Sequence, residues 1–202
     1  MAFAKGRTTE QACIEDTFEM YLIMIDEVSE IISNKTKSFD AEMREIAKNI
    51  SAGDAEIELD SYNQLSRFNL FDDCLLHSQN SFALMTYSFY EKSLKMLADN
   101  NGIKIKDKTK ISYAIKYYNG IEKHIISSNL CLNSKTQYLV NEIDIKFRDL
   151  RNSLVHDAID IERSDIYKSF SNKQSLIEFL NKVKCILLDI NKTLEQLKNR
   201  EV

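Results

Sequence analysis

The residue best placed to transfer a proton in this chain is His156, because it follows an arginine and an amide at helical spacing. The run reads Arg151-Asn152-Ser153-Leu154-Val155-His156. In a helix, which turns by about 100° per residue, Asn152 and His156 lie one turn apart on the same face, and Arg151 flanks them on the side of the apolar stripe. We therefore predict that the guanidinium, the amide and the imidazole share one arc that points away from the protein's own core.

These three side chains suit the cleavage of RNA. A guanidinium holds a phosphate through two parallel hydrogen bonds and stabilises the charge that develops on its oxygens. A neutral imidazole accepts the proton of the ribose 2′-hydroxyl, the internal nucleophile that DNA lacks. An amide such as Asn152 orients the imidazole or donates to the phosphate. This chemistry requires no metal and no cofactor, and we expect neither.

One imidazole supplies only one proton-transfer group, whereas cleavage needs a base and an acid. Two-fold pairing of two copies through the outward arc would bring two histidines and two arginines into one cleft. We therefore predict a homodimer whose active site lies across the interface.

A basic strip earlier in the chain is a candidate surface for binding RNA. A lysine stands at every second position from 104 to 110, and two tyrosines follow: Lys104, Lys106, Lys108, Lys110, Tyr113 and Tyr117. Lysines bind phosphates and aromatic rings stack on bases. The same pattern is also typical of an ordinary solvated connection followed by an amphipathic helix, and the sequence leaves both interpretations open.

The other histidines and the cysteines are expected to be structural. His77 follows two leucines on an apolar segment, where a hydrogen-bonded structural role is expected, and His124 is assigned no role. The cysteines are scattered along the chain, a spacing that fits neither a zinc site nor a disulfide framework. We expect Cys13, Cys74, Cys131 and Cys185 to be buried, reduced thiols.

The composition predicts an all-helical fold. The 202 residues include no proline and only four glycines, too few to supply the turns of a sandwich or barrel. With 44% hydrophobic and 29% charged residues the chain can bury a core. A net charge of −4 argues against a protein that coats nucleic acid by bulk charge, but not against one that binds a few phosphates locally.

Apolar spacing of three and four predicts a series of helices in one structural domain. We expect them at about residues 8–33, 39–51, 59–100 (in two pieces joined near Asn69), 109–118, 121–128, 133–159 and 174–199. The stretch 103–110 is predicted to be an exposed connection. The last helix carries three unbroken apolar heptads, which favour either the seam of an antiparallel bundle or a coiled coil with a partner.

The motif Arg151-Asn152-…-His156 resembles the R-x4–6-H motif of the HEPN superfamily, whose members carry it on a late core helix that is followed by one more long helix. The stretch Ser81–Glu91 resembles an early core helix of these domains, and Glu91 stands where an acidic residue is often found, which suggests a supporting role. The resemblance covers residues 71–199. Residues 1–70 would then form an additional N-terminal helical region packed on the same core.

The resemblance implies a dimeric, metal-independent endoribonuclease that serves in phage defence, abortive infection or a toxin–antitoxin system. Members that pair with a nucleotidyltransferase antitoxin often carry a tyrosine two residues after the histidine. Ala158 stands there instead, which weakens that regulatory scheme. Some members are inactive binding modules, so the alternative is a non-catalytic helical module that binds or regulates a protein partner.

We expect the chain to act in the cytoplasm and not in a membrane. Its N-terminal residues lack an apolar signal core, and its longest apolar run, 21–25, is far shorter than a membrane span. The expected partners are a second copy, an RNA substrate, and an antitoxin or regulatory protein.

Overall fold

The described residues fold into five α-helices. The structure, a computed structural model, describes residues 7–49, 67–105, 112–156, 170 and 172–200. The helices are α1 (Thr9–Asn49), α3 (Arg67–Asn100), α4 (Tyr113–Ser127), α5 (Ser134–His156) and α6 (Lys173–Lys198). No strand occurs in these ranges, so the all-α class expected from the lack of proline and scarcity of glycine is confirmed for this part of the chain.

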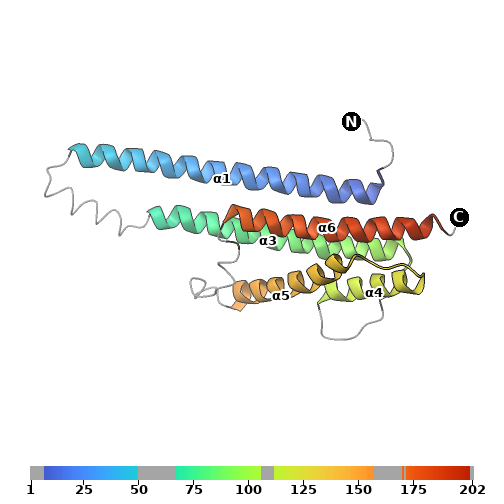
Figure 1. The fold of residues 1–202 in the computed structure, drawn as a ribbon. Helices are drawn as coiled ribbons and strands as arrows, with labels where there is room; N and C mark the ends of the chain where they lie inside the picture. The colour runs from blue at the N-terminus through green and yellow to red at the C-terminus, as the bar shows by residue number, and fades with distance from the viewer. Residues whose placement is uncertain (1–6, 50–66, 106–111, 157–169, 171, 201–202) are drawn as a thin grey trace.

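Polar contacts at both ends fix how α1 lies against α6. The hydroxyl of Thr8, at the start of α1, donates to Glu195 near the end of α6 (2.7 Å). Asp26, further along α1, forms an ion pair with Lys173 at the start of α6 (2.6 Å). The two helices therefore run in opposite directions. Figure 1 shows α3 running alongside α6, with α4 and α5 on the far side of this pair from α1.

All five helices contribute to one hydrophobic core. Side chains with almost no exposed surface come from each helix, for example Ile14, Leu94, Ile121, Ile143 and Leu187. Each such side chain stabilises the fold by about 1.5–3 kcal/mol through removal of apolar surface from water. The N-terminal helix α1 thus packs on the same core as the helices that follow it.

The first helix is uninterrupted, so the break predicted at residues 34–38 is wrong. After Ile32 the apolar stripe continues through Thr36 to Phe39 and Met43, at spacings of four, three and four. Phe39 and Met43 are buried, and the Thr36 hydroxyl donates to the carbonyl oxygen of Ile32 (3.0 Å). The stretch contains no glycine or proline that would interrupt the helix, and its other polar side chains are exposed: Asn34, Lys35, Lys37 and Ser38.

Helix α3 begins at Arg67, two residues before Asn69, where the sequence predicts a join between two helical pieces. Asparagine costs a helix interior well under 1 kcal/mol, so it does not by itself end one. The part predicted before Arg67 lies outside the described residues. The end of α3 is as predicted: Gly102 follows it with a φ of 66°, a left-handed conformation that glycine adopts without strain.

Helix α4 runs through Gly120, where the sequence predicted that one helix would end and a weaker one begin. That prediction is wrong for a packing reason. A Cβ atom on Gly120 would collide with the side chain of Ile105 and touch Ile103. The glycine therefore allows the preceding connection to pass close to the helix, and it does not end the helix.

Helices α5 and α6 begin close to their predicted positions, each after an asparagine. The side chain of Asn133 accepts a hydrogen bond from the backbone N–H of Lys135 (2.9 Å). The side chain of Asn172 accepts one from the N–H of Ser175 (2.8 Å). Asparagine is among the best residues at this position because its oxygen satisfies an N–H that the helix leaves free. The predicted end of α5 near Ile159 lies outside the described residues.

The heptads of α6 pack within the chain. All seven members of the stripe are buried: Leu176, Leu180, Val183, Leu187, Ile190, Leu194 and Leu197. Of the two interpretations left open by the sequence, the seam within the bundle is therefore the one observed. This stripe is not available to a separate coiled-coil partner.

The cysteines differ from expectation, because Cys13, Cys74, Cys131 and Cys185 are all exposed, although none is in a disulfide. Cys13 and Cys185 each precede a fully buried isoleucine by one residue. One residue turns a helix by about 100°, which is enough to point the thiol away from the core. His77 on α3 is exposed as well.

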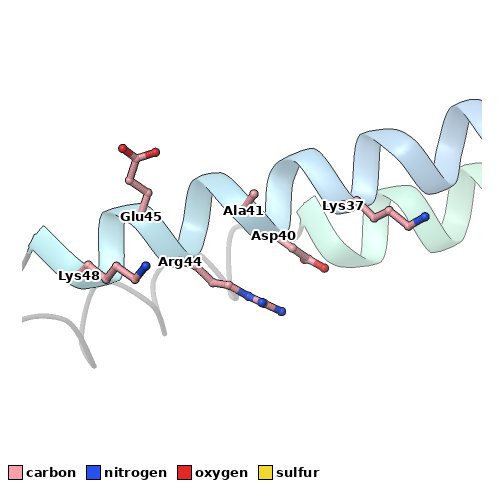
Figure 2. A pocket seen from close by; sticks show the side chains of 6 residues that line it. All are labelled: Lys37, Asp40, Ala41, Arg44, Glu45 and Lys48. Atoms are coloured by element: carbon pink, nitrogen blue, oxygen red, sulfur yellow. The ribbon is translucent and has the colours of Figure 1, made fainter.

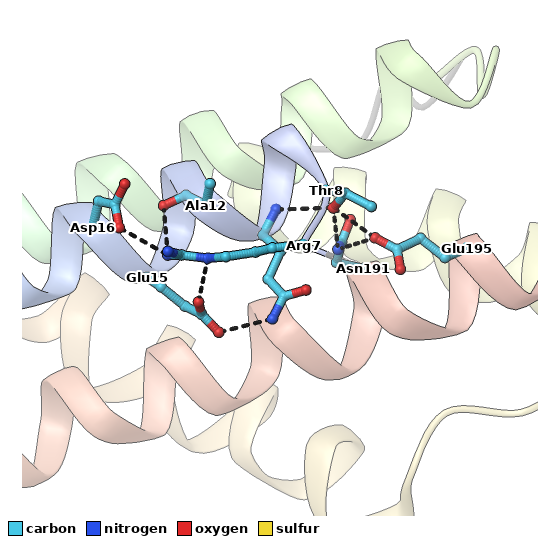
Figure 3. A network of polar contacts seen from close by, with 8 residues as sticks. Arg7, Thr8, Ala12, Glu15, Asp16, Asn191 and Glu195 are labelled. Carbon is cyan, nitrogen blue, oxygen red and sulfur yellow. Dashed lines mark hydrogen bonds and ion pairs between the residues drawn. The ribbon is translucent and has the colours of Figure 1, made fainter. Parts of the chain in front are cut away.

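A polar network joins the start of α1 to the end of α6 (Figure 3). Thr8 lies at the centre of this network. The Thr8 hydroxyl accepts a hydrogen bond from the backbone N–H of Gln11 (3.2 Å) and donates one to Glu195. The same Glu195 oxygen accepts from the amide of Asn191 (2.6 Å). Thr8 thus caps α1 and links it to α6 at the same time.

We expect Thr8→Ala to lower the free energy of unfolding by about 1 kcal/mol, because it removes a helix cap. Thr8→Ser keeps the hydroxyl and should cost less than half as much. Thermal or urea unfolding of the two variants measures the difference. Equal losses in both variants would show that the methyl group, and not the hydrogen bonds, makes the contribution.

In the described part of the chain, no helix combines the length and the apolar character needed to cross a membrane.

Candidate functional site

Stacked aromatic rings hold the middle of α5 against the core. The ring of Phe147 lies parallel to that of Tyr87 on α3, with centroids 3.8 Å apart. Its other neighbour is Phe179 on α6, at 6.3 Å. Phe147 is 2% exposed. It therefore fixes the face of α5 that points into the bundle, one helical turn before the candidate motif begins.

A carboxylate beside this stack ties three helices together. Asp144 of α5 accepts a hydrogen bond from the hydroxyl of Tyr87 (3.1 Å) and another from the hydroxyl of Ser112 (2.5 Å). Ser112 is also the N-cap of α4, since its side chain accepts from the N–H of Ile115 (3.2 Å). The position of α5 is thus coupled to α3 and to the start of α4. Asp144 is not among the residues predicted from the sequence, because its partners lie far from it along the chain.

The opposite side of α5 is exposed and partly apolar. Tyr138 is 70% exposed and Ile145 is 53% exposed, with the exposed Asn141 between them. Positions 152 and 156 continue this row, because 152 follows Ile145 by two turns and 156 follows Tyr138 by five turns. The helix register therefore places positions 152 and 156 in line with the exposed Tyr138 and Ile145.

The candidate catalytic residues lie on the last two turns of α5. Arg151, Asn152 and His156 belong to the described backbone of this helix, while their side chains lie outside the described part of the structure. Position 151 follows Phe147 by one turn and Asp144 by two, so its register is at the edge of the core-facing side.

Glu91, the candidate supporting acid, is half-buried on α3 one turn after Tyr87. Figure 1 shows α5 running opposite to α3. Since Tyr87 meets Phe147, the chain of α3 beyond Tyr87 leads away from the end of α5. Glu91 and His156 therefore lie on opposite sides of the Tyr87–Phe147 contact along the bundle.

The basic strip is only partly described. Lys104 is exposed in the connection after α3, whereas Lys106, Lys108 and Lys110 lie outside the described residues. Tyr113 opens α4 with 65% of its surface exposed, and the ammonium of Lys116 lies 5.1 Å from its ring centroid. Tyr117 is half-buried against the core. Of the two tyrosines, Tyr113 thus has the more exposed ring.

Buried tyrosines cluster close to Asp144. Tyr90 is 1% exposed, and its hydroxyl has no hydrogen-bond partner among the described residues. Burial raises the pKa of Tyr90, and the nearby Tyr87, Tyr118 and Asp144 raise it further. Burial likewise raises the pKa of Tyr87 and of Tyr118. The protein interior at this point holds neutral phenols and strongly disfavours their ionised form.

We expect Tyr90→Phe to raise the free energy of unfolding by about 1 kcal/mol near neutral pH, because it removes an unsatisfied buried hydroxyl. The gain should grow above pH 10. There the wild-type tyrosine ionises in the unfolded chain but not in the folded one, so its raised pKa makes the wild type lose stability as pH rises. Urea unfolding between pH 7 and 11 measures this. Tyr113→Phe, at an exposed site, should show neither effect, and a loss of stability in Tyr90→Phe would contradict the account.

A separate hollow of about 700 Å³ follows the last turns of α1. Among the described residues it is lined by Lys37, Asp40, Ala41, Arg44, Glu45 and Lys48. Figure 2 shows Arg44 and Glu45 projecting to opposite sides of the helix. None of the residues that the sequence singled out lines this hollow, and its mixed charges define no ligand.

The chain matches no protein-family model, no curated protein sequence and no solved structure.

Proposed function

We propose that this protein is a metal-independent endoribonuclease of the HEPN type that works in the cytoplasm as a homodimer. The observation that carries the proposal is the spacing of Arg151, Asn152 and His156 on α5, where positions 152 and 156 are in register with the exposed Tyr138 and Ile145. A phosphate-binding cation and a proton-transfer group at this spacing suit a ribose-phosphate linkage.

The proposed reaction is an internal transfer followed by release of the leaving group. One His156 accepts the proton of the 2′-hydroxyl as its oxygen bonds to phosphorus. The bond from phosphorus to the 5′-oxygen breaks, and that oxygen takes a proton from the His156 of the second copy. Arg151 stabilises the charge on the phosphate oxygens, and Asn152 orients the imidazole. The products are a 2′,3′-cyclic phosphate and a 5′-hydroxyl.

The exposed row of α5 supports pairing of two copies through this face. Tyr138 and Ile145 are large apolar side chains on the same row as the candidate site. Tyrosine is enriched in protein interfaces because it combines a large apolar surface with a hydroxyl. A two-fold axis beside this row would cover both side chains and bring the two motifs into one cleft.

We further propose that residues 71–199 form an antiparallel HEPN-like bundle and that residues 1–70 are an N-terminal addition to it. The order of the helices supports this: the motif lies on α5, and one long helix, α6, follows it. In this proposal Lys104, Tyr113 and their neighbours in the basic strip bind flanking RNA. An antitoxin or regulatory protein would restrain the nuclease in a defence or toxin–antitoxin system.

Incubation of the purified chain with RNA in EDTA tests the proposal. We expect cleavage without added metal, and we expect the activity per chain to fall on dilution as dimers dissociate. An absence of cleavage over a range of RNAs and concentrations would favour the alternative, a non-catalytic helical module that binds a protein partner.

A further inference from the structure

The outward face of α1 carries a row of large apolar side chains that the bundle leaves exposed. Met20 is 49% exposed, Ile23 51% and Ile31 59%. Glu27 lies between the two isoleucines, four residues from each, so the four residues form one row on the side of the helix opposite the core stripe. The row is about 16 Å long at 1.5 Å per residue. A row of this kind is more than the scattered single exposed residues of an ordinary surface.

The charge around this row has one sign up to its last turn, and the first cation beyond it is the exposed Lys35, one turn after Ile31. Between Thr8 and Asn34 the chain contains seven acidic residues and no lysine, arginine or histidine. Four of the seven already have partners: Glu10 accepts from Asn100, Glu15 and Asp16 pair with Arg7, and Asp26 pairs with Lys173.

The remaining three acidic residues are the ones next to the apolar row. Glu19, Glu27 and Glu30 are exposed, and none of them has a hydrogen bond or ion pair with another described residue. The face is thus a set of apolar anchors with unpaired negative charge in its middle and along one side.

This charge pattern indicates which kind of partner can bind the face. A second copy of the same face would bring three further unpaired carboxylates and a single cation, Lys35 beyond the end of the row, and like charges across an interface cost free energy. RNA and anionic lipid surfaces are repelled for the same reason. A helix with apolar residues at spacings of three and four and with lysine or arginine at its flanks matches both features.

We propose that this face of α1 binds a basic amphipathic helix of another protein. Apolar side chains of that helix cover Met20, Ile23 and Ile31, and its cations pair with Glu19, Glu27 and Glu30. The inference does not depend on the ribonuclease activity, because it uses a different helix and a different face of the bundle.

Two synthetic helical peptides of about 18 residues test the proposal, one made of leucine and lysine in an amphipathic pattern and one with glutamate in place of lysine. With the full chain, fluorescence anisotropy should show that the lysine peptide binds at least tenfold more tightly than the glutamate peptide. The double variant Ile23→Ser/Ile31→Ser should lose at least tenfold in affinity for the lysine peptide. The triple variant Glu19→Lys/Glu27→Lys/Glu30→Lys should reverse the preference.

Matched controls separate this face from general surface effects. Ile126→Ser removes an equally exposed isoleucine from α4, and Glu42→Lys reverses an exposed charge elsewhere on α1. Both should bind as the wild type does. Equal binding of the two peptides, or unchanged binding by the Ile23→Ser/Ile31→Ser variant, would overturn the proposal. So would self-association of the wild type that this variant abolishes, since a second copy would then occupy the face.

Discussion

His156→Ala and Arg151→Ala should each lower the rate of RNA cleavage by about 10²–10⁴-fold. Loss of a positioned proton-transfer group costs a reaction of this kind about 10²–10⁴. Loss of a group that stabilises developing charge costs a comparable factor of about 10²–10³. Because the two residues act on the same transition state, the double variant should be little slower than either single variant.

Initial rates on a fluorescent RNA measure these losses, and circular dichroism verifies that each variant is folded. Arg44→Ala and His124→Ala are the matched controls, since they remove the same two residue types from α1 and α4. The controls should retain wild-type rates. If folded His156→Ala protein cleaves RNA at the wild-type rate, the imidazole of His156 takes no part in the reaction.

Phe147→Ala should lower the free energy of unfolding by about 3–5 kcal/mol, the usual cost of removing a buried aromatic side chain. The ring is almost fully buried and stacks on Tyr87 at 3.8 Å. Its loss leaves a cavity between α3, α5 and α6. It also releases the turn of α5 that precedes Arg151, so RNA cleavage should fall even at temperatures where the variant is folded.

Urea unfolding together with activity at low temperature measures both effects. Phe147→Leu fills most of the cavity and should recover part of the stability and the activity. Tyr113→Ala removes an aromatic ring that is 65% exposed, and it should change stability by less than about 0.5 kcal/mol. A Phe147→Ala variant as stable as Tyr113→Ala would contradict the observed packing.

The sequence predicted the helices better than it predicted their ends. Apolar spacing identified the core stripes of α1 and α6, because periodicity is a direct consequence of which face is buried. The breaks predicted at residues 34–38 and at Gly120 are wrong because local polarity and a single glycine do not by themselves end a helix. Burial of Phe39 in one case and contact with Ile105 in the other outweighs those local signals.

For the candidate site, the sequence supplied the residue types and the helix register but not the surroundings. The role of Asp144 depends on Tyr87 and Ser112, which are 57 and 32 residues away along the chain. No local pattern predicts a contact at that separation. The exposed cysteines were not predicted for a related reason: a shift of one residue along a helix moves a side chain from the core to the solvent, and the sequence does not fix the register that finely.

The most direct test of the proposed function compares two substrates in EDTA: one RNA, and the same sequence with 2′-O-methyl groups in place of all 2′-hydroxyls. We expect the wild-type chain to cut the first into fragments with 2′,3′-cyclic phosphate and 5′-hydroxyl ends, and to leave the second intact. Cleavage of both substrates would contradict attack by the 2′-oxygen. Failure to cut any RNA, with the dimer shown to be present, would contradict the ribonuclease itself.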